Sequence, residues 1–437
     1  MQADDQTASP EGGLAVPPGG SAGGTAEQGG RPPVPSYRAL FAIPRMGRIL
    51  LGMVIARIGG SMLGVAIVLF ALGRFGSPAL AGIVTFASVA PGLFMAPVIG
   101  ALLDRHGRTR LIIAGQTAGA LLLLAIAALA ITGLLNEWLL VALTGLVGMT
   151  GPLASLGLRT LFPIIVPRHL WERANAIDSN GYVVATLVGP PAAGFLAQVA
   201  GGPVTLGLIA LLYGASAAVL FGAPDPRTAV ASTGSLVRDA WQGLSYTLRN
   251  PTLRGLGVSL AVLNLGWGVV TIVVPVLLLG QLGQGEGMVG IVFAVGGVTG
   301  GIGALIAGRW RVMGHERRIL VIAMAGMAAS TVFLLLSPTL PVVVAVMALT
   351  GFLNGPLDVA MFTLRQRRTD QAWMGRAFAV SMSMNFMGYP FGAAIGGAIV
   401  VQGVAAAFGL AIAFTTAGAV LGALMLPPDE GARVSGR

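Results

Sequence analysis

The chain contains twelve apolar stretches, each long enough to cross a lipid bilayer as a helix. An α-helix needs about 20 mostly apolar residues to span the hydrocarbon core. Hydrophobic residues make up 55% of the 437 residues and charged residues only 10%, whereas soluble domains contain about 25% charged residues. The sequence therefore predicts an all-α membrane protein with twelve transmembrane helices. The expected spans are Leu50–Leu72, Ala79–Leu103, Leu111–Leu134, Trp138–Val166, Ala174–Ala200, Val204–Phe221, Leu256–Leu279, Met288–Ala307, Ile319–Leu336, Pro341–Leu364, Ala377–Val401 and Val404–Leu426.

The basic residues are unevenly divided between the two sets of loops that join these spans. All 26 of them are arginines, and one set of loops holds most of them while the opposite set holds only Arg74. Such a bias indicates that the arginine-rich loops and both termini lie in the cytoplasm, in a multi-pass protein of the inner (cytoplasmic) membrane. The net charge of +10 then reflects orientation in the lipid bilayer, and we expect no binding of nucleic acid.

Residues that are missing from the chain exclude several kinds of chemistry. There is no cysteine and no lysine, which excludes disulfides, thiolate metal sites, a P-loop lysine and a Schiff-base lysine. The three histidines, His106, His169 and His315, fall in the expected cytoplasmic loops. No cluster inside the bundle supplies metal ligands or a nucleophile with its base. We therefore expect no enzymatic activity, no metal and no cofactor, and a monomer that binds a small molecule and protons.

Composition divides the chain into five segments. The first is rich in Gly, Pro, Ala and Ser and is expected to be disordered. It has no apolar core behind a basic start, so it is not a signal peptide. Between the sixth and seventh spans, Val237, Ala240, Trp241, Leu244 and Leu248 share one helical face, which predicts an amphipathic helix at the cytoplasmic interface. The expected segments are a cytoplasmic tail 1–37, a six-helix bundle 38–222, a linker 223–253, a second six-helix bundle 254–427 and a tail 428–437.

The two halves of the chain repeat each other. The phrase ALTGLVGMTGPLAS at 142–155 returns as ALTGFLNGPLDV at 348–359, and GALLDRHGR at Gly100 returns as GALIAGRWR at Gly303, 203 residues later. Gly189 corresponds to Gly392 at the same offset. The halves are therefore expected to be parallel, pseudo-symmetric copies of one six-helix unit. Duplicated halves in a membrane protein favour secondary transport, with the substrate site near the midplane between them.

The loop after the second span has the pattern of a known signature. It reads glycine, then Asp-Arg-x-Gly-Arg, through Gly100, Asp104, Arg105, Gly107, Arg108 and Arg110. This resembles the loop between the second and third helices of the major facilitator superfamily. The resemblance implies the major facilitator fold and a latch of Asp104 and Arg108 at the cytoplasmic gate; a topology anchor alone is the simpler interpretation. The second copy has Ala307 in place of the acid, so any latch is asymmetric.

Further motifs narrow the resemblance. Gly189, Pro190 and Gly194 in the fifth span resemble the Gly-Pro motif of antiporters in this superfamily, although plain helix packing would use the same residues. The segment from Arg159 to Pro167, together with Ala174-Asn175-Ala176, is similar to the macrolide-efflux and enterobactin-exporter branch of drug:proton antiporters. This resemblance covers most of the chain beyond residue 40. The chain departs from this pattern in one respect: it lacks the arginine that many drug antiporters carry in the middle of the fourth span.

Charged residues within the apolar spans are candidates for function, because burying a charge in a membrane is costly. Asp358 lies about two turns inside the tenth span, Arg57 lies in the first span, and Asp178 and Arg159 lie near the inner ends of the fifth and fourth. A carboxylate that loses its hydration takes up a proton more readily and can release it when water returns. We expect Asp358 to be the main proton site, with Arg57 as its partner or as the contact for a substrate anion. The alternative is a fixed Asp–Arg pair that only holds helices together, and Asp178 fits a structural role.

Polar residues at spacings of four indicate which helices line a cavity. Thr350, Asn354 and Asp358 share one face of the tenth span. Methionine and aromatic residues around them can repack against varied apolar molecules. The expected cavity residues are Arg57, Ser61, Asn264, Trp267, Thr350, Asn354, Asp358, Ser381 and Asn385, with Met361, Met382, Met384 and Phe386 as apolar neighbours.

The sequence thus favours a secondary transporter that exports amphiphilic, drug-like or siderophore-like molecules by proton antiport. Import of a small organic solute by proton symport is an alternative with the same fold. From another functional class, a membrane receptor or scaffold that transports nothing also stays open. The sequence does not identify the substrate.

Overall fold

The computed structural model describes residues 36–225, 236–309, 312, 314–370 and 373–429, which form one compact unit. Most of the expected tails, at 1–35 and 430–437, and part of the linker, at 226–235, lie outside the described residues. Within these described residues, twelve helices are long and apolar enough to cross a membrane, as the sequence predicts. In the first half these are α2 (Met46–Phe75), α3 (Pro78–His106), α4 (Arg108–Ile131), α5 (Glu137–Ile165), α6 (Trp171–Ala200) and α7 (Gly202–Leu220).

The second half contains the other six spanning helices. They are α9 (Pro251–Val276), α10 (Glu286–Ala307), α11 (Glu316–Leu336), α12 (Leu340–Arg367), α13 (Met374–Ile399) and α14 (Val404–Met425). Shorter elements are α1 (Tyr37–Phe41), α8 (Leu236–Arg249), the 3₁₀ helices η1 (Arg168–Leu170) and η4 (Val400–Gln402), and a π-helical turn η2 (Leu277–Gln281) that continues α9.

Capping residues end one helix and begin the next at the turns between spans. Gly76 ends α2 in a left-handed conformation (φ 63°) that L-residues with a side chain avoid. The side chain of Ser77 then accepts a hydrogen bond from the amide of Leu80 at 3.1 Å, and Pro78 occupies the first turn of α3. Asn250 caps α9 in the same way, with Pro251 behind it. These local signals separate neighbouring spans that hydropathy alone would merge.

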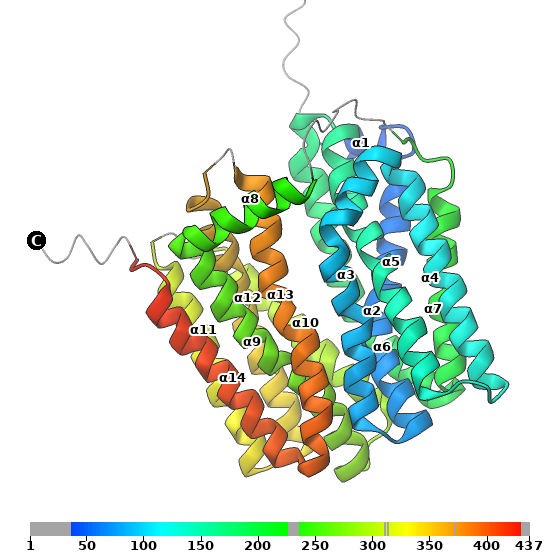
Figure 1. Cartoon of the computed structure of the whole chain (residues 1–437), viewed down its shortest axis with the longest axis vertical. Coiled ribbons are helices and arrows are strands. Elements are labelled where there is room, and N and C mark those ends of the chain that lie inside the picture. The colour runs from blue at the N-terminus through cyan, green and yellow to red at the C-terminus, as the bar shows by residue number, and fades with distance from the viewer. Residues whose placement is uncertain (1–35, 226–235, 310–311, 313, 371–372, 430–437) are drawn as a thin grey trace, which may run out of the picture. The chain divides into compact units, whose positions relative to one another are not determined.

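The same helix pairs pack together in both halves. In the first half α2 packs on α6 and α7, α4 packs on α5 and α7, and α3 packs on α5; in the second half α9, α11 and α10 make the corresponding contacts. Two pairs make the main contacts between the halves: α3 with α13, and α6 with α10. Figure 1 shows the two bundles side by side. The sequence repeat therefore corresponds to a structural repeat.

Two ends of the bundle can be distinguished by charge. We call the end where α2 and α9 begin and α7 and α14 finish the arginine-rich end, because its turns hold most of the arginines. The other end, with the turns at 76–77, 132–136, 282–285 and 337–339, is the arginine-poor end.

The cores of the two halves merge only towards the arginine-poor end. There, Ile272 and Ala393 of the second half belong to the core cluster of the first, and Leu69 and Ala197 of the first half belong to the cluster of the second. At the arginine-rich end, each buried cluster of the described residues draws on one half alone. The halves are thus held together mainly at one end.

Glycines allow this joint to be close. A Cβ atom on Gly82 of α3 would lie 2.4 Å from the carbonyl oxygen of Ala393 on α13. A Cβ atom on Gly290 of α10 would lie 2.3 Å from the carbonyl oxygen of Pro190 on α6. Both distances are too short for any side chain, and the obstructing atoms belong to the backbone of the other half.

Helix α8 is fastened to the second half. The hydroxyl of Tyr246 and the carboxylate of Asp370 are hydrogen-bonded at 3.1 Å, and the ring of Tyr246 stacks on Trp373 with centroids 5.0 Å apart. In Figure 1, α8 lies across the ends of neighbouring helices. Trp241, which is 68% exposed, and Leu248 of the expected apolar face point away from the core. Among the described side chains of α8, Gly243 and Thr247 are buried, so its packing side is not the side that carries Trp241 and Leu248.

Candidate functional site: a cavity beside α12

A cavity of about 780 Å³ lies in the second half, where it faces α2 and α6 of the first. This volume is within the usual range for sites that bind small organic molecules. The lining is largely apolar, with glycines, aromatic rings and a few polar side chains. Its polar and aromatic members are Thr186, Asn264, Trp267, Thr271, Phe293, Thr331, Thr350, Asn354, Asp358, Asn385, Phe386, Tyr389 and Thr415.

Asp358 is the one carboxylate among the described residues that line the cavity. The amide nitrogen of Asn354, one turn earlier on α12, donates a hydrogen bond to its Oδ2 at 2.9 Å. Two turns earlier than Asp358, the Oγ1 of Thr350 lies 3.2 Å from the hydroxyl of Ser330 on α11. The polar stripe that spacing predicted on this helix is therefore present on one wall of the cavity.

A second polar contact joins α9 to α13 across the cavity wall. The side-chain nitrogen of Asn264 lies 2.9 Å from Oδ1 of Asn385. The amide nitrogen of Asn385 lies 3.3 Å from the sulfur of Met361 on α12. The two amides are thus bonded to each other in the cavity wall, where Trp267 provides an aromatic face.

Six of the nine residues expected in a cavity line it, and three lie elsewhere. Those that line it are Asn264, Trp267, Thr350, Asn354, Asp358 and Asn385, and the apolar neighbours Met361 and Phe386 line it too. Ser61 packs against Gly189 instead, with its side chain where a Cβ of that glycine would be. Ser381 is fully buried, and Arg57 forms an ion pair away from the lining. Met382 and Met384 are also outside the lining.

Arg57 pairs with Asp178, which differs from the pairing with Asp358 that we expected. Its Nη2 lies 2.6 Å from Oδ1 of Asp178, its Nη1 donates to the backbone oxygen of the same residue, and its guanidinium lies 3.7 Å from the ring centre of Tyr182. The reason is the packing order: α2 lies against α6, whereas α12 packs between α10 and α11. Two of the three candidate charges therefore neutralise each other.

Arg365 is a buried charge that sequence reasoning placed in a loop. Helix α12 continues to Arg367, so Arg365 lies inside it, and its side chain is fully buried. Its Nε lies 3.1 Å from the hydroxyl of Ser381 on α13. The signal that could have found it is the sequence repeat, since Leu-Arg at 364–365 follows Leu-Arg at 158–159 by 206 residues, the same offset that separates the two ALTG phrases at 142 and 348. The side chain of Arg159 is not among those described.

The signature loop is held by an aspartate that we did not foresee. Gly107 separates α3 from α4 with φ 92°, and Asp225, which follows α7, lies against it. The carboxylate of Asp225 accepts a hydrogen bond from the amide of Thr109 at 3.0 Å and forms an ion pair with Arg110 at 3.7 Å. The favourable field at a helix N-terminus explains this position. Gly100 has open space beside it and Arg108 is buried; the side chains of Asp104 and Arg105 lie outside the described part.

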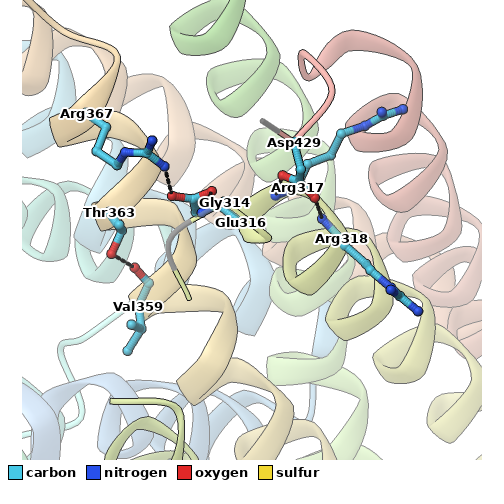
Figure 2. A network of polar contacts seen from close by, with 8 residues as sticks. All are labelled: Gly314, Glu316, Arg317, Arg318, Val359, Thr363, Arg367 and Asp429. Carbon is cyan, nitrogen blue, oxygen red and sulfur yellow. Dashed lines mark hydrogen bonds and ion pairs between the residues drawn. The ribbon is translucent and has the colours of Figure 1, made fainter. Parts of the chain in front are cut away.

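The second half uses the same device at α11. Figure 2 shows Asp429, which follows α14, accepting hydrogen bonds from the amides of Arg317 at 2.9 Å and Arg318 at 3.2 Å. Beside it, the buried carboxylate of Glu316 lies 2.5 Å from Nη1 of Arg367. In each half, therefore, an acid after the last helix holds the start of the third. Sequence reasoning missed both because the two acids stand outside any apolar span.

The Gly-Pro motif lies at the contact between the halves. Pro190 lines the cavity, and Gly194 approaches the backbone oxygen of Glu286 on α10 so closely that a Cβ would lie 2.4 Å from it. Gly189 faces Ser61 of α2. The motif thus serves close packing on both sides of α6.

Comparison with known proteins identifies the family. The sequence profile of the Major Facilitator Superfamily matches residues 49–264 and again 256–436. An uncharacterized MFS-type transporter, y4rN, of Sinorhizobium fredii is 37% identical over 90% of this chain and 98% of its own length. A mutant of the nucleoside transporter NupG has the same fold, with a TM-score of 0.69 at 13% identity, over 87% of this chain and 98% of that one.

Two further relatives have named functions. The multidrug efflux pump Tap of Mycobacterium tuberculosis is 28% identical over 83% of this chain and 90% of its own length. The enterobactin exporter EntS of Shigella boydii is 25% identical over 86% of this chain and 90% of its own length. The resemblance that the signature loop and the segment after Arg159 indicated is confirmed. With twelve spanning helices in two matching halves and a family profile that matches each half, the chain belongs to the Major Facilitator Superfamily of membrane transporters.

Proposed function

We propose that this transporter exports amphiphilic small molecules in exchange for protons, by alternating access to the cavity beside α12. The observation that carries the proposal is the cavity itself, which combines a mostly apolar lining of about 780 Å³ with a carboxylate, Asp358. The functions named for the efflux relatives support the direction of transport.

The lining favours amphiphiles over sugars. Aromatic faces such as those of Trp267 and Phe386 bind flat or branched apolar groups, and Met361 can adapt its shape to them. Sugars need many hydrogen-bonding side chains, and here the amides of Asn264 and Asn385 already bind each other. A ligand of drug size with one polar or cationic group fits a lining that is mostly apolar and contains one carboxylate.

Asp358 is the proposed proton site. It is in a mostly apolar wall, yet it lies on the cavity, so water and substrate can both reach it. Proton binding and substrate binding then exclude each other at one carboxylate, which is the requirement for exchange. Because Arg57 already neutralises Asp178, that pair is assigned a structural role between α2 and α6.

The arrangement of the halves supports a cycle of access to the two sides. With the arginine-rich end in the cytoplasm, the merged cores and the glycine contacts close the cavity on the outer side. Rocking of one half against the other would open that side and bring the arginine-rich ends together. The signature residues Gly100, Asp104, Arg105, Gly107, Arg108 and Arg110 would then latch the inner side, and the exposed apolar face of α8 would lie on the inner membrane surface.

Accumulation of ethidium, a fluorescent amphiphile, in cells that lack their own efflux pumps tests the proposal. We expect cells with the wild-type protein to accumulate several-fold less dye than cells without it, and a protonophore to remove the difference. Thr350→Trp should fill the cavity and abolish efflux, whereas Thr416→Trp, at an exposed position of α14, should not. Increased accumulation would indicate an importer, and no effect of the protein would favour the receptor or scaffold; either result contradicts export.

A further inference from the structure

Arg365 is the largest fully buried side chain among the described residues. An arginine keeps its charge at any physiological pH, and a buried charge is costly unless another charge or several dipoles offset it. Its position, two residues before the end of α12, would allow a side chain of this length to reach water. The fact that it does not reach water calls for a reason.

Within the described part of the chain, the polar and aromatic contacts of the Arg365 side chain all go to uncharged residues of α13. Nε lies 3.1 Å from the hydroxyl of Ser381, Nη1 contacts the sulfur of Met382, and the guanidinium carbon lies 5.4 Å from the ring centre of Phe378. The remaining nitrogen, Nη2, is buried and has no hydrogen-bond partner within the described part of the chain. The contacts therefore hold the guanidinium in place but supply no negative charge.

Asp358 is the negative charge that can offset it. The two residues are seven positions apart on α12, which places them on the same face, about 10 Å apart along the axis. Long side chains on a helix point back towards its N-terminus, so the guanidinium of Arg365 is directed towards the turn of Asp358. The two groups attract each other electrostatically.

Other charged groups on the neighbouring helices are engaged or distant. The other titratable side chain of the described cavity lining is Tyr389 of α13. The remaining groups on the described side chains are Glu316 of α11, which pairs with Arg367, Glu286 at the arginine-poor end of α10, and the exposed Arg254 of α9. Arg317 and Arg318 of α11 lie beside Asp429, and the side chain of Arg376 on α13 is outside the described part. Within the described part, Asp358 and Arg365 thus form a pair of their own.

We propose that Arg365 is a positioning residue for proton exchange, which offsets the ionised carboxylate of Asp358 and carries its change of charge to the contact between α12 and α13. When Asp358 binds a proton, the buried guanidinium loses its counter-charge, and its hold on Ser381 and Met382 becomes the point at which the two helices loosen. Because α13 makes one of the two most extensive contacts with the first half, this change acts on the joint that must open. The inference rests on the proposed proton exchange at Asp358.

A double-mutant cycle on thermal stability tests the charge pairing without substrate or gradient. We would measure melting temperatures in detergent at neutral pH for the wild type, Asp358→Asn, Arg365→Gln and the double variant. In the wild-type background, Arg365→Gln should lower the melting temperature. In the Asp358→Asn background, the same substitution should lower it less or even raise it, because the arginine there has no counter-charge. The two effects should differ by about 2 °C or more. Equal effects of Arg365→Gln in both backgrounds would overturn the pairing.

The pH profile of ethidium efflux tests the role in exchange. Without the cation, the ionised form of Asp358 is less favourable, so Asp358 keeps its proton to higher pH, and the profile of Arg365→Gln should move upward by about 1 pH unit. Arg365→Lys should restore the midpoint, and Arg254→Gln, at an exposed arginine, should not move it. An unmoved midpoint in Arg365→Gln would contradict the inference.

Failure of the inference and failure of the proposed function give different results. If Asp358→Asn still transports ethidium when a pH gradient is imposed, the proposal of proton exchange at Asp358 is refuted. The double-mutant cycle on stability then tests the Asp358–Arg365 charge pair independently of transport. If Asp358→Asn is uncoupled but the cycle is additive and the midpoint stays in place, the proposed function stands and Arg365 has only a packing role.

Discussion

Replacing Gly290 by alanine is expected to reduce export at least tenfold and to open the cavity towards the arginine-poor side of the membrane. The added methyl group would lie 2.3 Å from the carbonyl oxygen of Pro190 and 2.9 Å from Cα of Pro191. Because both atoms belong to the backbone, no side-chain rotation relieves the overlap, and α6 and α10 must separate. The closed joint between the halves would lose stability relative to the open arrangement.

Labelling of a single cysteine measures this change directly. The chain has no cysteine of its own, so Thr350→Cys, in the cavity wall, would be the one site for a maleimide that cannot cross the membrane. With the reagent outside the cells, Gly290→Ala should raise the labelling rate, and Gly409→Ala, at a glycine of α14 with open space around it, should not. Unchanged labelling and efflux in Gly290→Ala would show that this contact does not control access.

The second large effect is expected at Asp358. In liposomes, Asp358→Asn should abolish ethidium transport driven by a pH gradient while exchange of ethidium without a gradient continues. An amide has nearly the shape of a carboxyl group and still bonds to Asn354, but it cannot carry a proton. Ethidium can still bind through the apolar lining, more weakly without the carboxylate, and helix movement is preserved, so transport continues but is no longer driven by protons.

The matched control is Asp370→Asn, the same change in the turn before α13, where Asp370 is exposed and bonded to Tyr246. It should leave gradient-driven transport intact. Gradient-driven transport at the wild-type rate in Asp358→Asn would refute the proton role, and loss of both modes of transport would indicate that Asp358 serves folding instead.

Much of the fold could be predicted because the membrane imposes a length and a polarity on each span. The expected span Leu50–Leu72, for example, lies within Met46–Phe75, and the repeat at an offset of 203 residues predicted the matching halves. The stripe of Thr350, Asn354 and Asp358 was found by the same logic, since spacing within one helix fixes which side chains share a face. Local periodicity thus provided the elements and one wall of the site.

The remainder depends on contacts between distant segments, which a single sequence does not display. Arg57 and Asp358 were the natural pair from charge alone, yet α2 packs on α6, so Asp178 is the partner. Arg365 was placed in a loop because hydropathy falls after Leu364, although the helix continues to Arg367. Asp225 and Asp429 follow α7 and α14, and the fold brings the ends of these helices to the starts of α4 and α11. The hydrogen bonds of the two acids therefore depend on tertiary packing, which the sequence does not display.

The measurement that tests the central claim most directly is proton release on substrate binding. Purified protein in weakly buffered detergent, with a pH-indicator dye, would be titrated with ethidium at a pH where the free protein is protonated at the site. Exchange at one carboxylate predicts that wild-type protein releases protons as ethidium binds and that Asp358→Asn binds ethidium without releasing them. Binding without proton release in the wild type, or equal release by the variant, would contradict the claim that proton and substrate compete at Asp358.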